Sequence, residues 1–248
     1  MNKIFTYILP LLLLPAIVGA EPANINEAEQ AIKDGNTVAL QQMIENGLDL
    51  NARDAAGNSL VYFAVTNSKS LKVLRILADN GADLDAPSAA TGETPLIYIV
   101  ATAERIQDEV KQVYAQNLTS QKWQEKKDNL EKIAAAEMIH AVKTLKLMID
   151  LGADINLETP FGTPLMKAAA NPWNSEMVKI LTDAGADVNQ PDQSGRTALF
   201  YAEANGCTDI TMQLIAAGSD VYHQDVYGKT YLEINKEDFK KEEIIHDM

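Results

Sequence analysis

Five short segments that each begin with glycine recur along this chain and constrain its fold more than any other feature. They read GLDLN, GADLD, GADIN, GADVN and GSDVY, and they begin at Gly47, Gly81, Gly152, Gly185 and Gly218. Successive glycines are separated by 34, 71, 33 and 33 residues, and a period near 33 is typical of a solenoid built from stacked copies of one supersecondary unit. We therefore expect a repetitive, elongated protein whose work is binding and not chemistry.

The residues before each glycine have the spacing of one helix face. An apolar side chain stands four positions earlier every time, at Met43, Leu77, Met148, Leu181 and Leu214. Glycine adopts the left-handed backbone that ends a helix at little steric cost, so each segment closes a helix. Another helix starts after the polar stretch that follows, where Pro95 and Pro164 suit a first helical turn. The repeating unit is therefore a turn, an inner helix, an outer helix and a loop.

These segments resemble the ankyrin repeat, whose pattern is GxTPLHxAA followed by an outer helix and GADVN. The inner-helix copies are GNSLVYFAV at 57–65, GETPLIYIV at 92–100, GTPLMKAAA at 162–170 and GRTALFYAE at 195–203. The resemblance runs from about residue 24 to 224. It implies an all-α ankyrin-repeat solenoid, made of helix-turn-helix repeats with β-turn loops. The family's histidine, which ties loop to helix, is replaced by Tyr62, Ile97, Met166 or Phe200, so we expect softer turns.

The period also sets the boundaries of the units. We expect an N-terminal capping repeat at 24–53, repeats at 54–86, 89–157, 160–190 and 192–223, and a C-terminal cap at 225–248. Each repeat buries its apolar face only against its neighbours, so the two end units need polar outer faces. Cys207 is the single cysteine, so no intrachain disulfide can form. A packed thiol is the expected state, and a redox or intermolecular role is the alternative.

One interval is irregular, because the 71 residues between Gly81 and Gly152 contain no repeat signal near their middle. Apolar residues there keep helical spacing, at Ile106, Val110 and Val113 and again at Trp123, Leu130 and Ile133. We therefore expect that the repeat at 89–157, the third when the N-terminal capping repeat is counted as the first, is extended by a long helical hairpin at about 101–140. This hairpin bends near residues 117–120. The hairpin is either a tolerated insertion whose helices pack on each other, or an arm that clasps a partner with Trp123 near its tip.

The N-terminus has the pattern of a secretory signal peptide. Lys3 precedes an apolar run at 4–18, and small residues follow at Gly19 and Ala20. About 15 apolar residues are short for a membrane span, which needs about 20. We therefore expect cleavage after residue 20, a mature chain of 21–248 without a membrane span, and a periplasmic location. Secretion, or an uncleaved anchor, is the alternative.

Composition narrows the classes of partner and activity. The chain carries 21 Lys and Arg against 35 Asp and Glu, a net charge of −14, and this field repels the phosphate backbone of nucleic acids. A basic protein is a natural partner. Acidic residues such as Asp154 and Asp187, however, belong to the repeated segment itself, so the net charge says little about the identity of the partner. The three histidines are scattered, and no metal-binding or nucleophile motif occurs. We therefore expect no catalytic residue, no metal and no cofactor.

The resemblance places partner contacts on the turn tips and on the exposed side of the inner helices. Apolar residues at such positions need an explanation, and aromatic residues and arginine contribute most to interface energies. Our candidate partner-binding residues are therefore Phe161, Trp173, Arg196, Val226, Tyr227 and Trp123. The alternative for each is local packing against the adjacent turn.

Together these patterns favour a monomer that binds another protein without catalysis. The chain looks like the signal-bearing ankyrin proteins of Gram-negative bacteria, some of which are linked to stress tolerance. One alternative is an immunity protein that blocks the active site of a secreted toxin, and another is an effector exported to act on a host. An ankyrin surface is shaped by a few variable residues on a common frame, so the pattern does not name the partner.

Overall fold

Helices form nearly all of the regular structure in this protein. The computed structural model describes residues 24–114 and 120–234, without the side chains of 114 and 120–123. The expected signal peptide, most of the expected bend at 117–120 and the end of the C-terminal cap lie outside these residues. Within them no strand occurs, and the backbone forms two isolated bridges, Arg53 with Ser59 and Thr159 with Gly162. None of the described helices is both long and apolar enough to cross a membrane.

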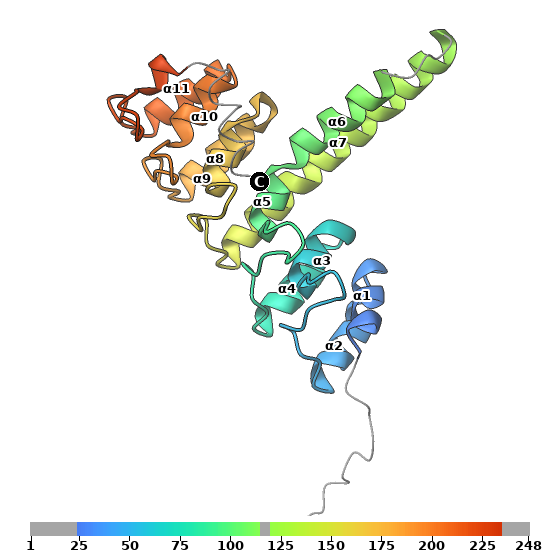
Figure 1. Ribbon diagram of the computed structural model, residues 1–248. Helices are drawn as coiled ribbons and strands as arrows, with labels where there is room; N and C mark the ends of the chain where they lie inside the picture. Colours follow the sequence, from blue (N-terminus) through green and yellow to red (C-terminus); the bar gives the residue numbers. More distant parts are fainter. Residues whose placement is uncertain (1–23, 115–119, 235–248) are drawn as a thin grey trace, which may run out of the picture.

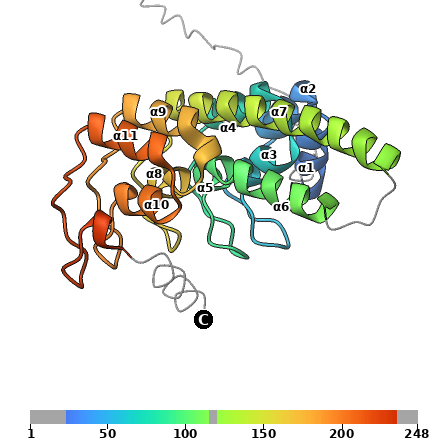
Figure 2. The ribbon, with the colours of Figure 1, turned by 90° about the horizontal axis from the view of Figure 1, so that it is seen from above.

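Five pairs of helices are stacked side by side. The inner helices are α1 (Ile25–Lys33), α3 (Leu60–Asn67), α5 (Pro95–Val100), α8 (Pro164–Ala169) and α10 (Ala198–Ala204). The outer helices are α2 (Thr37–Glu45), α4 (Leu71–Asp79), the end of α7 (Ser120–Asp150), α9 (Ser175–Asp183) and α11 (Thr208–Ala216). Figure 2 shows the two layers, with long loops on the side of the inner helices. Figure 1 shows the pairs following one another in an arc.

The repeated glycines end the outer helices, as the sequence predicted. Gly81 follows α4 with φ 88°, and its amide donates to the carbonyl of Ala78 at 2.9 Å, while Ala82 donates to Leu77 at 3.0 Å. These two bonds satisfy carbonyls that the helix end would otherwise leave free. A side chain with a Cβ would strain this backbone, which explains why glycine marks the period.

Asparagine at the end of the glycine segment joins three of the repeat loops to the loop of the next repeat. The side-chain oxygens of three asparagines accept the backbone N–H of an aspartate in the following repeat, at 3.0, 2.8 and 2.7 Å. The pairs are Asn51 with Asp83, Asn156 with Asp187, and Asn189 with Asp220. Each bond spans 31 or 32 residues, so the loops are held one repeat apart.

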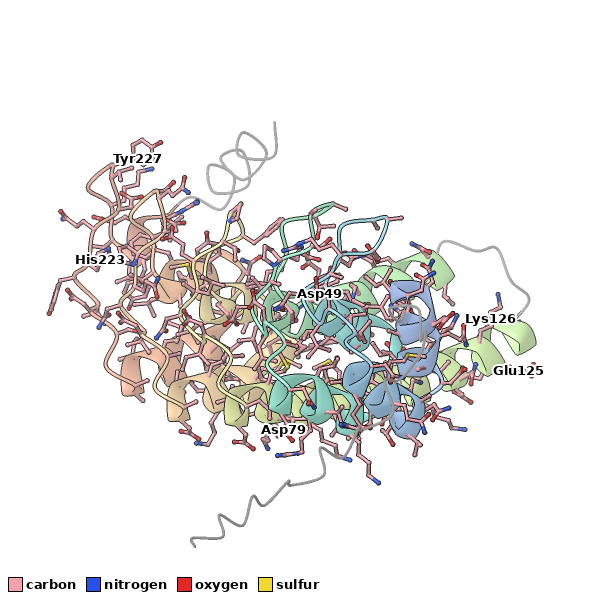
Figure 3. The ribbon with its side chains drawn as sticks, turned by 90° about the horizontal axis from the view of Figure 1, so that it is seen from below. Asp49, Asp79, Glu125, Lys126, His223 and Tyr227 are labelled. Atoms are coloured by element: carbon pink, nitrogen blue, oxygen red, sulfur yellow. The ribbon has the colours of Figure 1, made fainter. Side chains whose placement is uncertain are left out.

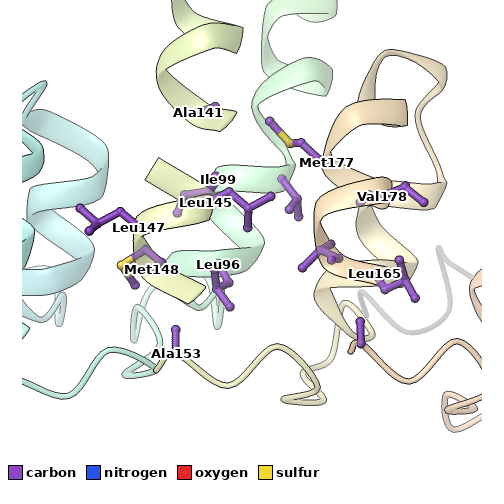
Figure 4. Close-up of a cluster of buried hydrophobic side chains, with 14 of the residues drawn as sticks. Leu96, Ile99, Ala141, Leu145, Leu147, Met148, Ala153, Leu165, Met177 and Val178 are labelled. Carbon is purple, nitrogen blue, oxygen red and sulfur yellow. The ribbon is translucent and has the colours of Figure 1, made fainter. Parts of the chain in front are cut away.

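The apolar core runs between the inner and outer layers from one repeat to the next. Four of the apolar residues that precede the glycines are fully buried, namely Leu77, Met148, Leu181 and Leu214. Figure 4 shows Leu96 of α5 and Leu145 of α7 beside Leu165 of α8 in the next repeat. Burying a leucine side chain stabilises a fold by about 2 kcal/mol. Because these contacts cross repeat boundaries, the stack stabilises each unit through its neighbours.

The long interval contains the expected helical hairpin, and its second helix is longer than expected. α6 (Thr102–Tyr114) follows α5, and α7 runs unbroken for 31 residues, about 46 Å at 1.5 Å per residue. The end of α7 is the outer helix of the third repeat, while its start packs on α6 and projects from the stack (Figure 1). The packing of the third repeat therefore fixes the direction of the arm.

Candidate functional site

A groove lies where α6 passes the inner helices of the fourth and fifth repeats. It has a volume of about 560 Å³, and we call it the α6 groove. Its lining includes Glu104, Gln107 and Lys111 of α6, Phe161 of the turn before α8, Lys167 of α8, Asn171 after α8, and Tyr201 of α10. The groove lies on the inner-helix side of the stack, where the resemblance implied partner contacts.

Polar contacts hold α6 against the fourth repeat. The Lys167 amine lies 2.7 Å from the Glu104 carboxylate. The side-chain amides of Gln107 and Asn171 bond to each other in both directions, at 3.3 and 3.2 Å. Asn171 is buried, where a polar side chain needs such a partner. These contacts fix the distance between the two walls of the groove.

The charges on the α6 wall are balanced locally. Asp108 and Lys111 form an ion pair at 2.9 Å, and both side chains are largely exposed. The nearby Asp108 carboxylate raises the pKa of the Lys111 amine. Glu104 is matched by Lys167 across the groove. The wall therefore offers hydrogen-bonding groups of both signs and no concentrated field.

A buried ion pair supports the floor of the α6 groove. The Nε of Arg196 lies 3.0 Å from a carboxylate oxygen of Asp192, and the side chains are 5% and 9% exposed. The same oxygen accepts the Tyr201 hydroxyl at 2.8 Å. The prediction that Arg196 is an exposed residue at a turn tip is therefore wrong, because Asp192, four residues earlier, draws the guanidinium into the fold.

Phe161 is the candidate whose aromatic ring the structure places in the groove, and Arg196 lines the same groove as a buried residue. It is partly buried and lines the groove from the turn before α8. Its amide donates to the Thr159 hydroxyl at 3.1 Å, which orders the turn that presents the ring. A contact between Phe161 and a partner stays a prediction.

Val226 and Tyr227 lie away from the α6 groove, on the turn of the last unit. They are exposed, and the Val226 amide donates to the Ser194 carbonyl at 2.9 Å, which attaches this turn to the preceding one. Figure 3 shows Tyr227 at the opposite end of the molecule from Lys126 of the hairpin. The structure therefore separates these two candidates from Phe161. The side chain of Trp123 lies outside the described residues.

Trp173 belongs to the short helix η1 (Pro172–Asn174), which lies between α8 and α9 of the fourth repeat. The next residue, Asn174, is buried and donates to the Val100 carbonyl at 2.9 Å, which fixes η1 against the start of the hairpin. Trp173 itself is 48% exposed and faces α7, on the other side of the hairpin from the α6 groove. It is therefore not part of that groove.

Several groove residues were missed by sequence reasoning. Gln107 and Asn171 meet although 64 residues separate them, and no local pattern predicts such a contact. One signal was present, because Glu104, Asp108 and Lys111 have the spacing of a single helix face. Among the residues that the structure describes, no group of His, Cys, Asp and Glu side chains could hold a metal ion.

Comparison with known proteins supports the repeat assignment. Residues 132–225 match the family model described as ankyrin repeats in three copies. Over 66 residues, 27% of this chain, the sequence is 39% identical to a protein of Fowlpox virus (strain NVSL) described as an ankyrin repeat protein. The match covers 13% of the length of that viral protein.

The described helices and the match over residues 132–225 agree with an all-α ankyrin-repeat fold, in which one repeat carries a projecting helical hairpin. Ankyrin repeats are a module for protein–protein interaction, because their common frame presents variable residues on an extended surface.

Proposed function

We propose that this chain binds a protein partner in the α6 groove and performs no catalysis. The observation that supports this most is the groove itself, a hollow of about 560 Å³ between two walls that are joined by Glu104–Lys167 and Gln107–Asn171 contacts. Pockets of about 300–1,000 Å³ bury ligands of the size of a few side chains, so we expect this hollow to take a few side chains of the partner. A wall whose geometry is set before binding costs little entropy when the partner arrives.

The charge of the chain favours a basic partner at long range. A net charge of −14 attracts a positively charged protein and speeds its association, an effect that salt screens. The α6 wall, with Asp108 beside Lys111, then recognises the partner through shape and hydrogen bonds. We expect association to slow as salt rises and dissociation to change little.

The proposed location is the periplasm. Its support is the sequence alone, namely Lys3 followed by the apolar run at 4–18. In a Gram-negative host the chain should appear in the periplasmic fraction with an N-terminus at Glu21. Recovery of an intact N-terminus in the cytoplasmic fraction would contradict this location. A role in stress tolerance is proposed only through the resemblance to signal-bearing ankyrin proteins, and survival of a deletion strain under envelope stress tests it.

The binding proposal is tested by capturing partners on the immobilised chain and on matched variants. Phe161→Ala removes the aromatic ring from the groove, and Tyr222→Ala removes an equally large ring that is 83% exposed at the far end of the stack. We expect loss of the partner with Phe161→Ala and retention with Tyr222→Ala. The opposite pattern would place the site on the last turns.

A second pair of variants separates an effect of the Glu104–Lys167 ion pair on the groove wall from an effect of unfolding. Glu104→Lys alone places two cations together, and we expect it to displace α6 and weaken binding. The double variant Glu104→Lys with Lys167→Glu restores an ion pair with reversed polarity, and it should restore binding if the pair acts by holding the wall. Equal binding by the wild type and both variants would show that the α6 wall takes no part in binding the partner.

An immunity protein is the second candidate function. The observation that favours it is the arm formed by α6 and the start of α7, which projects from the stack (Figure 1) and could enter the active site of a toxin. Expression of a candidate toxin in the periplasm, with and without this chain, tests the idea. Killing that is unchanged by the chain would contradict it.

A further inference from the structure

A second hollow lies on the other side of the hairpin, along α7. It consists of two adjoining parts of about 660 and 280 Å³ that share Ala134 and Trp173. The floor is an apolar stripe of α7 with Leu130, Ala134, Met138 and Val142. Trp173 and Met177 form one wall, and Val110 and Val113 of α6 line the outer part. We call this surface the α7 trough. It shares no lining residue with the α6 groove.

The α7 trough is open and apolar along much of its length. From Leu130 to Lys146 it follows 17 residues of helix, about 24 Å from first to last at a rise of 1.5 Å per residue. Ile139 is 56% exposed and Trp173 is 48% exposed. Contiguous exposed apolar surface of this kind, with charged residues at its borders, marks an interaction site. A length of four to five helical turns fits another helix.

The order of charges along α7 identifies the helix that would fit. The charged residues of α7 that line the trough are Lys127 and Glu131 near its outer end and Lys143 and Lys146 near its inner end. Met138 and Ile139 lie midway between Glu131 and Lys146. If a second α7 is laid antiparallel across this midpoint, Glu131 of each copy faces Lys146 of the other. The central apolar residues then face each other, and Ala135 faces Val142. The stripe is therefore complementary to itself.

Both charged residues are accessible for such a contact. Lys146 lies 3.6 Å from Glu176, with its side chain 55% exposed. Glu131 lies 3.7 Å from Lys127, with its side chain 66% exposed. Exposed pairs of this kind contribute little stability within one chain, so each residue can share its charge with a second copy at low cost.

We propose that the α7 trough is a self-association surface and that its occupant is α7 of a second copy of this chain. The resulting dimer is two-fold symmetric, since the same stripe is used by both copies. It leaves both α6 grooves open, so it presents two partner-binding sites. The dimer replaces the monomer expected from the sequence, and it does not depend on what the α6 groove binds.

Complementary charge reversals test the antiparallel register. Sedimentation velocity of the purified full chain over a concentration series should show a monomer–dimer equilibrium. Lys146→Glu alone and Glu131→Lys alone each put like charges at both symmetric contacts, and we expect each dimer to be on the order of tenfold weaker. An equimolar mixture of the two variants places opposite charges at both contacts, so the mixture should recover the wild-type dimer.

A pair of apolar substitutions on the same helix tests the location. Ile139→Asp places a charge in the trough and should weaken the dimer on the order of a hundredfold. Ile133→Asp is the matched control, because Ile133 is also exposed but lines neither part of the trough, and it should leave the dimer intact. A wild-type chain that stays monomeric up to about 1 mM, a mixture that fails to recover, or equal effects of the two substitutions would overturn the proposal.

Discussion

The carboxylate of Asp85 accepts the backbone N–H of Asp154, with 3.0 and 3.2 Å to its two oxygens, although 69 residues separate them. Elsewhere in the stack asparagine makes the same contact over 31 or 32 residues. The bond therefore places the loop of the third repeat beside that of the second at the ordinary spacing. The hairpin is an addition to the array and leaves the register of the repeats intact.

Replacing Asp85 with asparagine should stabilise the protein at neutral pH. Burial raises the pKa of the Asp85 carboxyl, and the charges of Asp154 and Asp83 add to the effect. A raised pKa means that the folded state binds the proton more tightly than the unfolded state. Protonated Asp85 therefore contributes to the free energy of unfolding at pH values below the ordinary pKa of aspartate. This contribution is lost as the pH rises through the folded-state pKa of Asp85. Asp85→Asn should therefore raise the urea midpoint near pH 7 and lose this gain near pH 3.

The control for this prediction is the reverse change one repeat later. Asn156→Asp introduces a carboxylate at the equivalent position, and it should lower the urea midpoint near pH 7 more than near pH 3. A gain for Asp85→Asn that is equal at both pH values would show that charge is not the cause.

Truncation of Leu145 should destabilise the junction between the hairpin and the stack. Leu145 is fully buried among residues of α5, α7 and the following repeat (Figure 4). Leu145→Ala should cost about 2 to 5 kcal/mol of unfolding free energy, because it leaves a cavity in packed surroundings. Leu232→Ala is the control, since Leu232 is 70% exposed, and it should change stability by less than about 0.5 kcal/mol. Urea denaturation measures both, and similar effects would contradict the packing described here.

Removal of the Arg196 side chain should lower the free energy of unfolding, although the repeat pattern places this residue on a surface turn. Arg196→Met leaves the buried Asp192 carboxylate without its ion pair, which costs about 3 kcal/mol in comparable buried pairs. Arg196→Lys should rescue little of this, because an ammonium does not reproduce the planar guanidinium. Thermal denaturation checks the prediction, and a melting temperature unchanged in Arg196→Met would place this side chain in solvent.

The Asn171 amide should control the mobility of α6. Asn171→Ala removes both hydrogen bonds to Gln107 and leaves that side chain without them, at a cost of about 1 to 3 kcal/mol. Hydrogen exchange should become faster in α6 and stay unchanged in α3, which is two inner helices away. Faster exchange throughout the protein would indicate general destabilisation and not a released arm.

Much of the fold could be predicted from local patterns, because each repeat encodes its own helix ends. Gly81 needs a positive φ, and the apolar residue four positions before each glycine reports the buried face. The unbroken course of α7 could not be predicted in the same way, since nothing in its sequence separates the arm from the outer helix. The α6 groove depends on pairs such as Glu104 with Lys167, which only the folded chain brings together. Arg196 was misjudged because its exposure depends on Asp192, which the turn pattern alone does not pair with it.

Hydrogen exchange of the chain with and without its captured partner shows whether a protein partner occupies the α6 groove. We expect slower exchange in α6 around Glu104 to Lys111 and in the turn around Phe161, with the last turn at Tyr227 unchanged. Protection confined to the last turns, or to the outer helices α2 and α4, would place the partner elsewhere and overturn the proposed site.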